Sequence, residues 1–157
     1  MQIRETFTVD AASDAVWRFF EDVERVGRCV PGVQSVTVLG TDRYRVVASQ
    51  KVGFVSVTFD MTTQMGAREP GRFMEFSSAG KSVKGAVGDL RSKDRVEFEA
   101  LAEGGTRVTL ISELSVGGML GALGHKAISA KSRDITAQFA EALRIQLETI
   151  ARGQGGT

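Results

Sequence analysis

Residues 55–62 read VSVTFDMT, with an apolar side chain at every odd position and a polar side chain at every even position. Successive side chains of a strand point to opposite faces of a sheet, so this alternation predicts a β-strand with one buried face. The same period of two recurs at residues 33–39, 43–52, 72–78, 90–98 and 108–116. Turn signals at Gly40, Pro70-Gly71 and Gly104-Gly105 separate these stretches, which favours an antiparallel meander.

The period changes to that of a helix on both sides of this meander. A first strand at residues 2–9 precedes two short helical segments, near residues 15–20 and 23–28, which Pro31-Gly32 ends. After Gly117-Gly118, apolar residues recur at steps of three, four and seven and predict one long helix that ends near Ile150. Its apolar stripe consists of Leu120, Leu123, Ala127, Ile128, Ile135, Phe139, Leu143, Leu147 and Ile150.

This order of elements predicts an α+β fold in which a seven-stranded, curved antiparallel sheet wraps around one long C-terminal helix. The sequence has 157 residues, which fits a single domain. We place that ligand-binding domain at residues 1–152. Residues 153–157 read GQGGT, the composition of a flexible tail or the start of a linker.

Composition excludes several functional classes. Twenty Lys and Arg balance 19 Asp and Glu to a formal charge of +1, whereas nucleic-acid binding depends on clustered positive charge. One Cys and one His exclude a disulfide framework and a zinc finger. The start of the chain lacks the pattern of a signal peptide, and no run approaches the ~20 apolar residues of a membrane span. We therefore expect a cytoplasmic protein with a reduced Cys29.

Small residues interrupt the contact between the predicted sheet and helix. Ser129, Ala130 and Ser132 break the apolar stripe between Ile128 and Ile135. Four glycines, Gly117, Gly118, Gly121 and Gly124, cluster where the last strand enters the helix, although each costs ~1 kcal/mol in a helix relative to alanine. They predict either a hinge and gate at the mouth of a pocket or a plain loop with a close packing contact.

We therefore predict an apolar cavity between sheet and helix, with ordinary core as the alternative for each residue in its walls. Two methionines among them suit an irregular ligand, because the methionine side chain is flexible and polarisable. On the sheet, the predicted wall consists of Val55, Val57, Phe59, Met61, Met74, Phe76, Leu90 and Val96. On the helix, it consists of Leu120, Leu123, Ile128 and Ile135.

The sequence contains no catalytic or metal-binding signature. His125 has no second metal ligand within reach by spacing, and Cys29 is expected to be a small buried residue rather than a reactive thiolate. The polar residues that could reach a pocket are Glu5, Tyr44, Asp60 and Glu75. A local basic excess consists of Lys81, Lys84, Arg91, Lys93 and Arg95, and is either a solvated strand face or a docking patch for anionic lipid or an acidic partner.

Four segments resemble a known family. They are residues 16–22 (VWRFFED), 29–33 (CVPGV), 52–59 (VGFVSVTF) and 118–124 (GMLGALG), the last followed by Phe139. Together and in this order, they make the chain similar to the START-like superfamily, also called helix-grip or SRPBCC. Within that superfamily the chain resembles the CoxG group of carbon monoxide dehydrogenase.

The resemblance implies a non-enzymatic binder of an apolar small molecule that acts with a molybdenum-type carbon monoxide dehydrogenase. A respiratory isoprenoid quinone of the menaquinone type is the ligand expected from it, with no covalent cofactor and no metal. Carrying such a ligand implies peripheral contact with the inner face of the cell membrane. Two other functions stay open: a polyketide cyclase or aromatase that uses Glu5, Asp60 or Glu75 for acid–base chemistry, and a ligand-free assembly or recruitment factor for the dehydrogenase.

Overall fold

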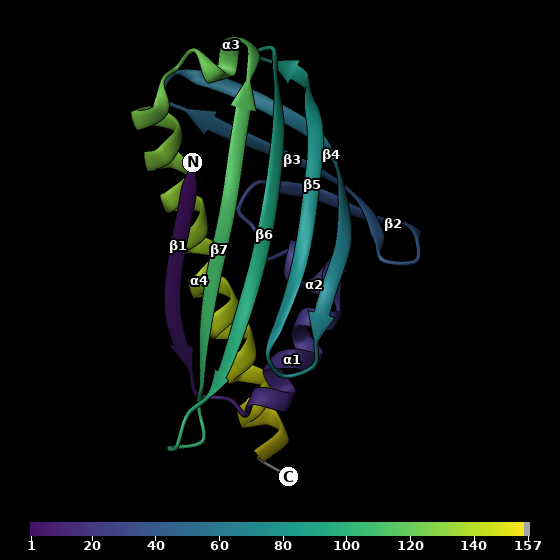
Figure 1. Ribbon diagram of the computed structural model, residues 1–157, viewed down its shortest axis with the longest axis vertical. Coiled ribbons are helices and arrows are strands. Elements are labelled where there is room, and N and C mark those ends of the chain that lie inside the picture. The colour runs from purple at the N-terminus through teal and green to yellow at the C-terminus, as the bar shows by residue number, and fades with distance from the viewer. Residues whose placement is uncertain (156–157) are drawn as a thin grey trace.

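A computed structural model describes residues 1–155 of the protein (Figure 1). Seven strands form one sheet, and four helices accompany it. The strands are β1 (Gln2–Val9), β2 (Val33–Gly40), β3 (Arg43–Val52), β4 (Val55–Glu69), β5 (Phe73–Gly85), β6 (Gly88–Ala100) and β7 (Thr106–Gly117). The helices are α1 (Ser13–Glu21), α2 (Val23–Gly27), α3 (Gly118–Gly121) and α4 (His125–Gly155).

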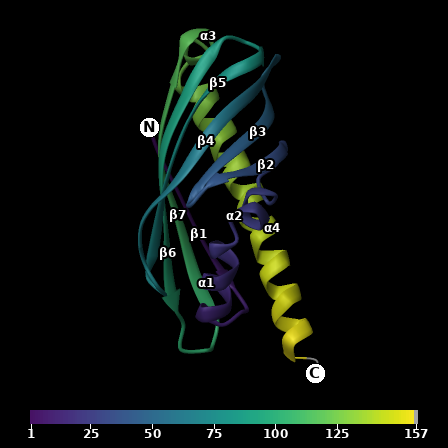
Figure 2. The same ribbon diagram turned by 90° about the vertical axis from the view of Figure 1, so that its right-hand side faces the viewer.

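The sheet is antiparallel throughout, in the order β1-β7-β6-β5-β4-β3-β2. The meander from β2 to β7 follows the chain, and β1 then pairs with β7, so that the first two strands occupy opposite edges. The chain crosses from one edge to the other through α1 and α2, which lie on the same side of the sheet as α4 (Figure 2). The predicted α+β fold, a curved sheet around a C-terminal helix, is confirmed.

One end of the molecule has a closely packed core. Val16 and Phe20 of α1 are almost fully buried, together with Leu143 and Leu147 of α4. Phe98 of β6 receives the rings of Trp17 and Phe20 edge-to-face, with centroids 5.4 and 5.2 Å away. Such aromatic pairs add ~0.5–1.5 kcal/mol beyond the area they bury, so this core holds the C-terminal half of α4 firmly against the sheet.

The C-terminal helix differs from the prediction at both ends. Its predicted start forms the separate short helix α3, because Gly124 adopts a φ of +95° that a regular helix does not allow. Leu120 of α3 packs with Val57 and Phe59 in a small cluster apart from the main core. At the other end, α4 continues to Gly155, three residues into the predicted tail, whereas residues 156–157 lie outside the described part of the chain.

Among residues 1–155, none of the helices combines the length and hydropathy needed to cross a lipid bilayer.

Candidate functional site

A cavity of about 370 Å³ separates the concave face of the sheet from α4. It lies next to the closely packed core, under the N-terminal half of α4, from Phe139 toward the start of the helix. From α4 it is lined by Ser132, Ile135, Thr136 and Phe139, so Ser132, one of the small residues that interrupt the apolar stripe, leaves room at this level. Its volume lies within the ~300–1,000 Å³ typical of small-molecule sites.

Apolar side chains form most of the cavity wall. Five of the residues predicted for it line it: Met61, Phe76, Leu90, Val96 and Ile135. A further group of wall residues was not predicted; it comes from α2, the loop after it, the edge strand β2 and its neighbour β3. This group consists of Val23, Val26, Val30, Val33, Val36 and Val46.

The other predicted wall residues lie elsewhere. Met74 has no exposed surface and belongs to the main core beneath α1. Val55, Val57, Phe59 and Leu120 form the small cluster at the α3 end. Ile128 is buried without lining the cavity, and Leu123 is partly exposed in the turn between α3 and α4. Apart from Leu123, these residues point to the same side of the sheet or helix as the cavity wall, but they lie nearer to one end of the molecule than the cavity does.

A band of polar side chains crosses the sheet wall of the cavity. Thr63 of β4, Ser78 of β5, Ser92 and Asp94 of β6, and Ser112 of β7 all line it. The strand register brings them together, because Thr63 is opposite Ser78, Ser78 is opposite Ser92, and Asp94 is opposite Ser112. The hydroxyls of Thr63 and Ser78 lie 2.8 Å apart, and the Ser92 hydroxyl donates to Oδ2 of Asp94 at 2.9 Å.

Asp94 is the carboxyl group of this band. Burial raises its pKa, and hydrogen bonds from Ser112 and Ser92 oppose that rise. Arg95 also lines the cavity, but its guanidinium binds Glu75 and Glu97 at 3.0 Å each, outside the band. The band therefore offers hydroxyls and one carboxyl group to a ligand whose remaining surface is apolar.

The carboxylates predicted for acid–base chemistry do not converge on the cavity. Asp60 forms an ion pair of 2.7 Å with Arg45 on the outer face of the sheet, and the hydrogen bond from Arg45 lowers the pKa of Asp60. Glu75 pairs with Arg95 on the same face. Glu5 follows the inward phase of β1, opposite Leu110, but neither it nor Tyr44 lines the cavity. The cyclase hypothesis that relies on Glu5, Asp60 or Glu75 as the acid or base is therefore not supported by their positions.

The four glycines surround α3. Gly118, the first residue of α3, has a φ of +71°, and Gly124, just before α4, also has a positive φ, a conformation that favours glycine. A Cβ atom on Gly121 would lie 2.7 Å from the carbonyl oxygen of Val116, and one on Gly117 would meet Asp89. Close packing thus requires glycine at positions 117 and 121, whereas the hinge and gate at the mouth of a pocket stay a prediction.

His125 and Cys29 occupy the positions expected for non-catalytic residues. His125 is exposed at the start of α4. Cys29 is buried, its thiol donates to the carbonyl oxygen of Arg25 at 3.6 Å, and burial raises its pKa. Within the described part of the chain, no cluster of three or more His, Cys, Asp or Glu side chains is arranged to hold a metal ion.

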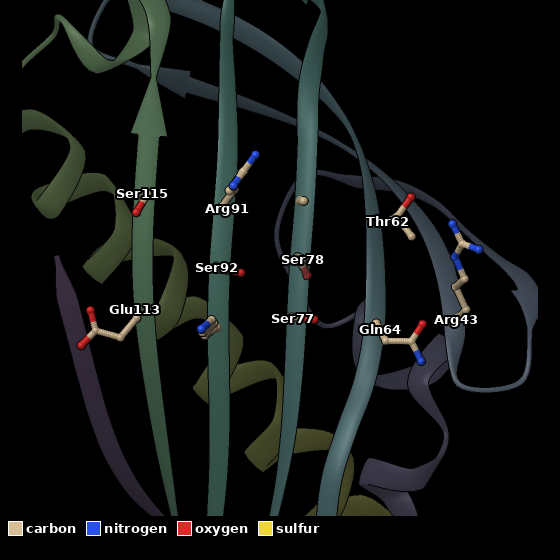
Figure 3. A pocket seen from close by; sticks show the side chains of 11 residues that line it. Arg43, Thr62, Gln64, Ser77, Ser78, Arg91, Ser92, Glu113 and Ser115 are labelled. Atoms are coloured by element: carbon tan, nitrogen blue, oxygen red, sulfur yellow. The ribbon is translucent and has the colours of Figure 1, made fainter.

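A second hollow, of about 600 Å³, lies on the opposite face of the sheet, where α4 is behind the strands (Figure 3). Its side chains include Arg43 of β3, Arg91 and Lys93 of β6, and Glu113 of β7. The sheet forms the floor of this hollow, and no helix of residues 1–155 covers it. Arg91 and Lys93 of the predicted basic excess thus lie on this open strand face, and the docking patch stays a prediction.

Comparison with known proteins places these features in a family. Residues 6–148 match the CoxG family of carbon monoxide dehydrogenase. None of the curated proteins matches the chain by sequence.

Several solved structures share the fold at low sequence identity. A conserved protein from Geobacillus kaustophilus has 15% identity and a TM-score of 0.85, with 95% of this chain and 96% of that chain covered. The Zhui aromatase/cyclase from Streptomyces sp. R1128 has 17% identity and a TM-score of 0.75, with 100% and 99% covered. A START superfamily protein from Mycobacterium smegmatis has 13% identity and a TM-score of 0.70, with 95% and 98% covered.

Proposed function

Because this chain belongs to the CoxG family of carbon monoxide dehydrogenase, we propose that it is a non-enzymatic carrier of a long apolar molecule for such a dehydrogenase. The observation that carries the proposal is the cavity of about 370 Å³ beneath α4, with its mainly apolar wall. An apolar molecule gains ~0.8 kcal/mol for each CH₂ group that leaves water, so a site of this kind favours uptake of a hydrocarbon chain.

The polar band narrows the class of ligand. The hydroxyls of Thr63 and Ser78 bond to each other, and that of Ser112 bonds to Asp94, but a hydroxyl oxygen can accept more than one hydrogen bond. A ring with oxygen substituents can join these hydrogen bonds, whereas a hydrocarbon or a simple lipid tail cannot. A respiratory isoprenoid quinone of the menaquinone type combines such a ring with a long apolar tail. It also accepts electrons, which a carbon monoxide dehydrogenase must pass on.

The end of the molecule at α3 has an exposed apolar surface, which would allow the protein to contact a membrane and take up the ligand there. The β3–β4 turn, the β5–β6 turn and α3 meet there (Figure 1), held by a hydrogen bond from the amide of Leu120 to the carbonyl of Val87. We call this the apolar end. Its exposed apolar residues are Phe54, fully exposed, with Val83, Val87 and Met119. Lys51 and Lys84 flank them, and each lysine near an anionic membrane adds ~1 kcal/mol of attraction.

Transfer from vesicles tests the proposal. The purified protein is mixed with vesicles that contain menaquinone, separated from them, extracted with organic solvent and analysed for quinone. We expect about one quinone per protein molecule and faster reduction of the quinone when the matching dehydrogenase and carbon monoxide are present. Recovery of no quinone from repeated mixtures would refute the proposal.

Asp94 supports an enzymatic alternative, a cyclase or aromatase that uses this partly buried carboxyl group as acid or base. Such an enzyme would release a chemically altered product, whereas a carrier returns its ligand unchanged. Mass analysis of the extracted ligand separates the two. The third function, a ligand-free assembly factor, gains no support from the cavity, because a filled interior is the observation that would favour it.

A further inference from the structure

We propose that Asp94 is the head-group anchor of the cavity and holds a ring oxygen of the ligand in both of its redox states. As a neutral carboxyl group it donates a hydrogen bond to the carbonyl oxygen of the oxidised ring. As a carboxylate it accepts a hydrogen bond from the hydroxyl of the reduced ring. This inference rests on the proposed function, because it requires a ligand that interconverts carbonyl and hydroxyl groups.

The position of Asp94 fits this role. It lies on β6, opposite Phe76 on β5 and opposite Ser112 on β7, so an apolar wall and a hydroxyl flank it. Ser92 donates to its Oδ2 at 2.9 Å, and Ser112 also hydrogen-bonds to it. A carboxyl group has two oxygens with about four lone-pair positions, so two serine hydroxyls fix its orientation and leave capacity for a ligand.

No cation in the cavity holds Asp94 in its charged form. Of the described residues that line the cavity, only Asp94 and Arg95 ionise in the ordinary pH range or carry charge, and the guanidinium of Arg95 binds Glu75 and Glu97 instead. The elements packed around the cavity carry other charged groups that do not line it. They include Arg4 and Glu5 on β1, Arg18 and Glu21 on α1, Glu24 and Arg25 on α2, Arg43 and Arg45 on β3, Asp60 on β4, Glu75 and Lys81 on β5, Arg91 and Lys93 on β6, Glu113 on β7, and Lys131, Arg133 and Asp134 on α4.

The two forms of Asp94 favour different ligands. A carbonyl oxygen needs a donor, which the neutral carboxyl group supplies and the carboxylate does not, since the carboxylate only accepts. If the neutral form alone anchors the carbonyl, affinity for the oxidised ring falls about tenfold for each pH unit above the pKa of Asp94. Affinity for the reduced ring does not fall in this way, because its hydroxyl donates to the carboxylate. The site therefore releases the oxidised form at higher pH and retains the reduced form.

Calorimetric titration from pH 5 to pH 8 tests the anchor with three probes that share the same carbon skeleton. These are 2-methyl-1,4-naphthoquinone, its reduced diol kept under anaerobic conditions, and 2-methylnaphthalene, which has no oxygen. For the wild type we expect a falling affinity for the quinone, a flat or rising affinity for the diol and weaker binding of the hydrocarbon. Asp94→Asn keeps an N–H donor without a titrating proton, so its quinone affinity should not vary with pH.

Asp60→Asn is the matched control, because Asp60 is a carboxylate on the outer face of the sheet and should leave every profile unchanged. A quinone profile in Asp94→Asn that follows the wild type, or equal affinity of the wild type for quinone and hydrocarbon, would overturn the anchor while leaving the carrier intact. Failure of all three probes to bind the wild type would overturn the proposed function itself.

A measurement on the wild type alone makes the test independent of how the variant folds. The carboxyl carbon of Asp94 is followed by NMR over the same pH range, with and without each probe. Bound quinone should raise the pKa of Asp94 and bound diol should lower it. An Asp94 signal that neither probe moves would also overturn the anchor.

Discussion

Replacing Ser132 with leucine tests directly whether the space beneath α4 is empty. Ser132 lines the cavity from α4, and the structure shows no hydrogen bond from its hydroxyl within the described residues. Leucine adds three carbon atoms in place of that hydroxyl, and burial of each contributes ~0.8 kcal/mol. Ser132→Leu should therefore raise the free energy of unfolding of the ligand-free protein by about 2 kcal/mol. The same change should weaken quinone binding at least tenfold, because it occupies the site.

Ser129→Leu is the matched control on the same helix. Ser129 is 5% exposed but does not line the cavity, so leucine at this position has no space to fill. Overpacking of a filled interior costs ~1–3 kcal/mol, and Ser129→Leu should lower the free energy of unfolding by that amount. Urea unfolding followed by circular dichroism measures both variants. A Ser132→Leu variant that loses as much stability as Ser129→Leu would refute the empty cavity.

Three further predictions concern other parts of the molecule. Replacing Phe54 and Met119 with serine should reduce sedimentation with anionic vesicles severalfold, whereas Ile145→Ser, at an exposed apolar position on α4, should not. Equal loss in both variants would count against the apolar end as the membrane contact. Leu143→Ala should lower the free energy of unfolding by ~3–5 kcal/mol, because Leu143 has no exposed surface, and a loss below ~1 kcal/mol would contradict the tight core there. Burial raises the pKa of Asp94 in the folded protein, so the free energy of unfolding of the ligand-free protein should fall as the pH rises from the unfolded-state pKa to the folded-state pKa of this group. Asp94→Asn should remove that fall, and an unchanged dependence of stability on pH in the variant would disprove this prediction.

The sheet could be predicted from the sequence because its period is regular. Residues 55–62 alternate without exception, and β4 forms there with the phase expected, Val57 and Phe59 inward. The helix boundary could not be predicted in the same way. Leu120 and Leu123 continue the helical steps, and only the positive φ of Gly124 shows that the chain turns between α3 and α4. Spacing alone does not distinguish a helix from two helices joined by a glycine.

The polar band was not predicted from the sequence, for a related reason. Ser92 and Asp94 occupy the inward phase of β6 between Leu90 and Val96, so the strand's alternation contains the signal. Polar residues at two successive inward positions of one strand indicate a place where the apolar packing between sheet and helix is interrupted. That Ser112 and Ser78 join them depends on the register between strands, which a single sequence does not reveal.

The position of a bound quinone is the most direct test of the account. A crystal structure of the protein with a short-chain menaquinone would show where the ring and tail lie. We expect density for the ring beside Asp94 and Ser112, with the tail along Met61 and Ile135 under α4. A quinone on the outer face of the sheet, or an interior filled by side chains at saturating quinone, would contradict it.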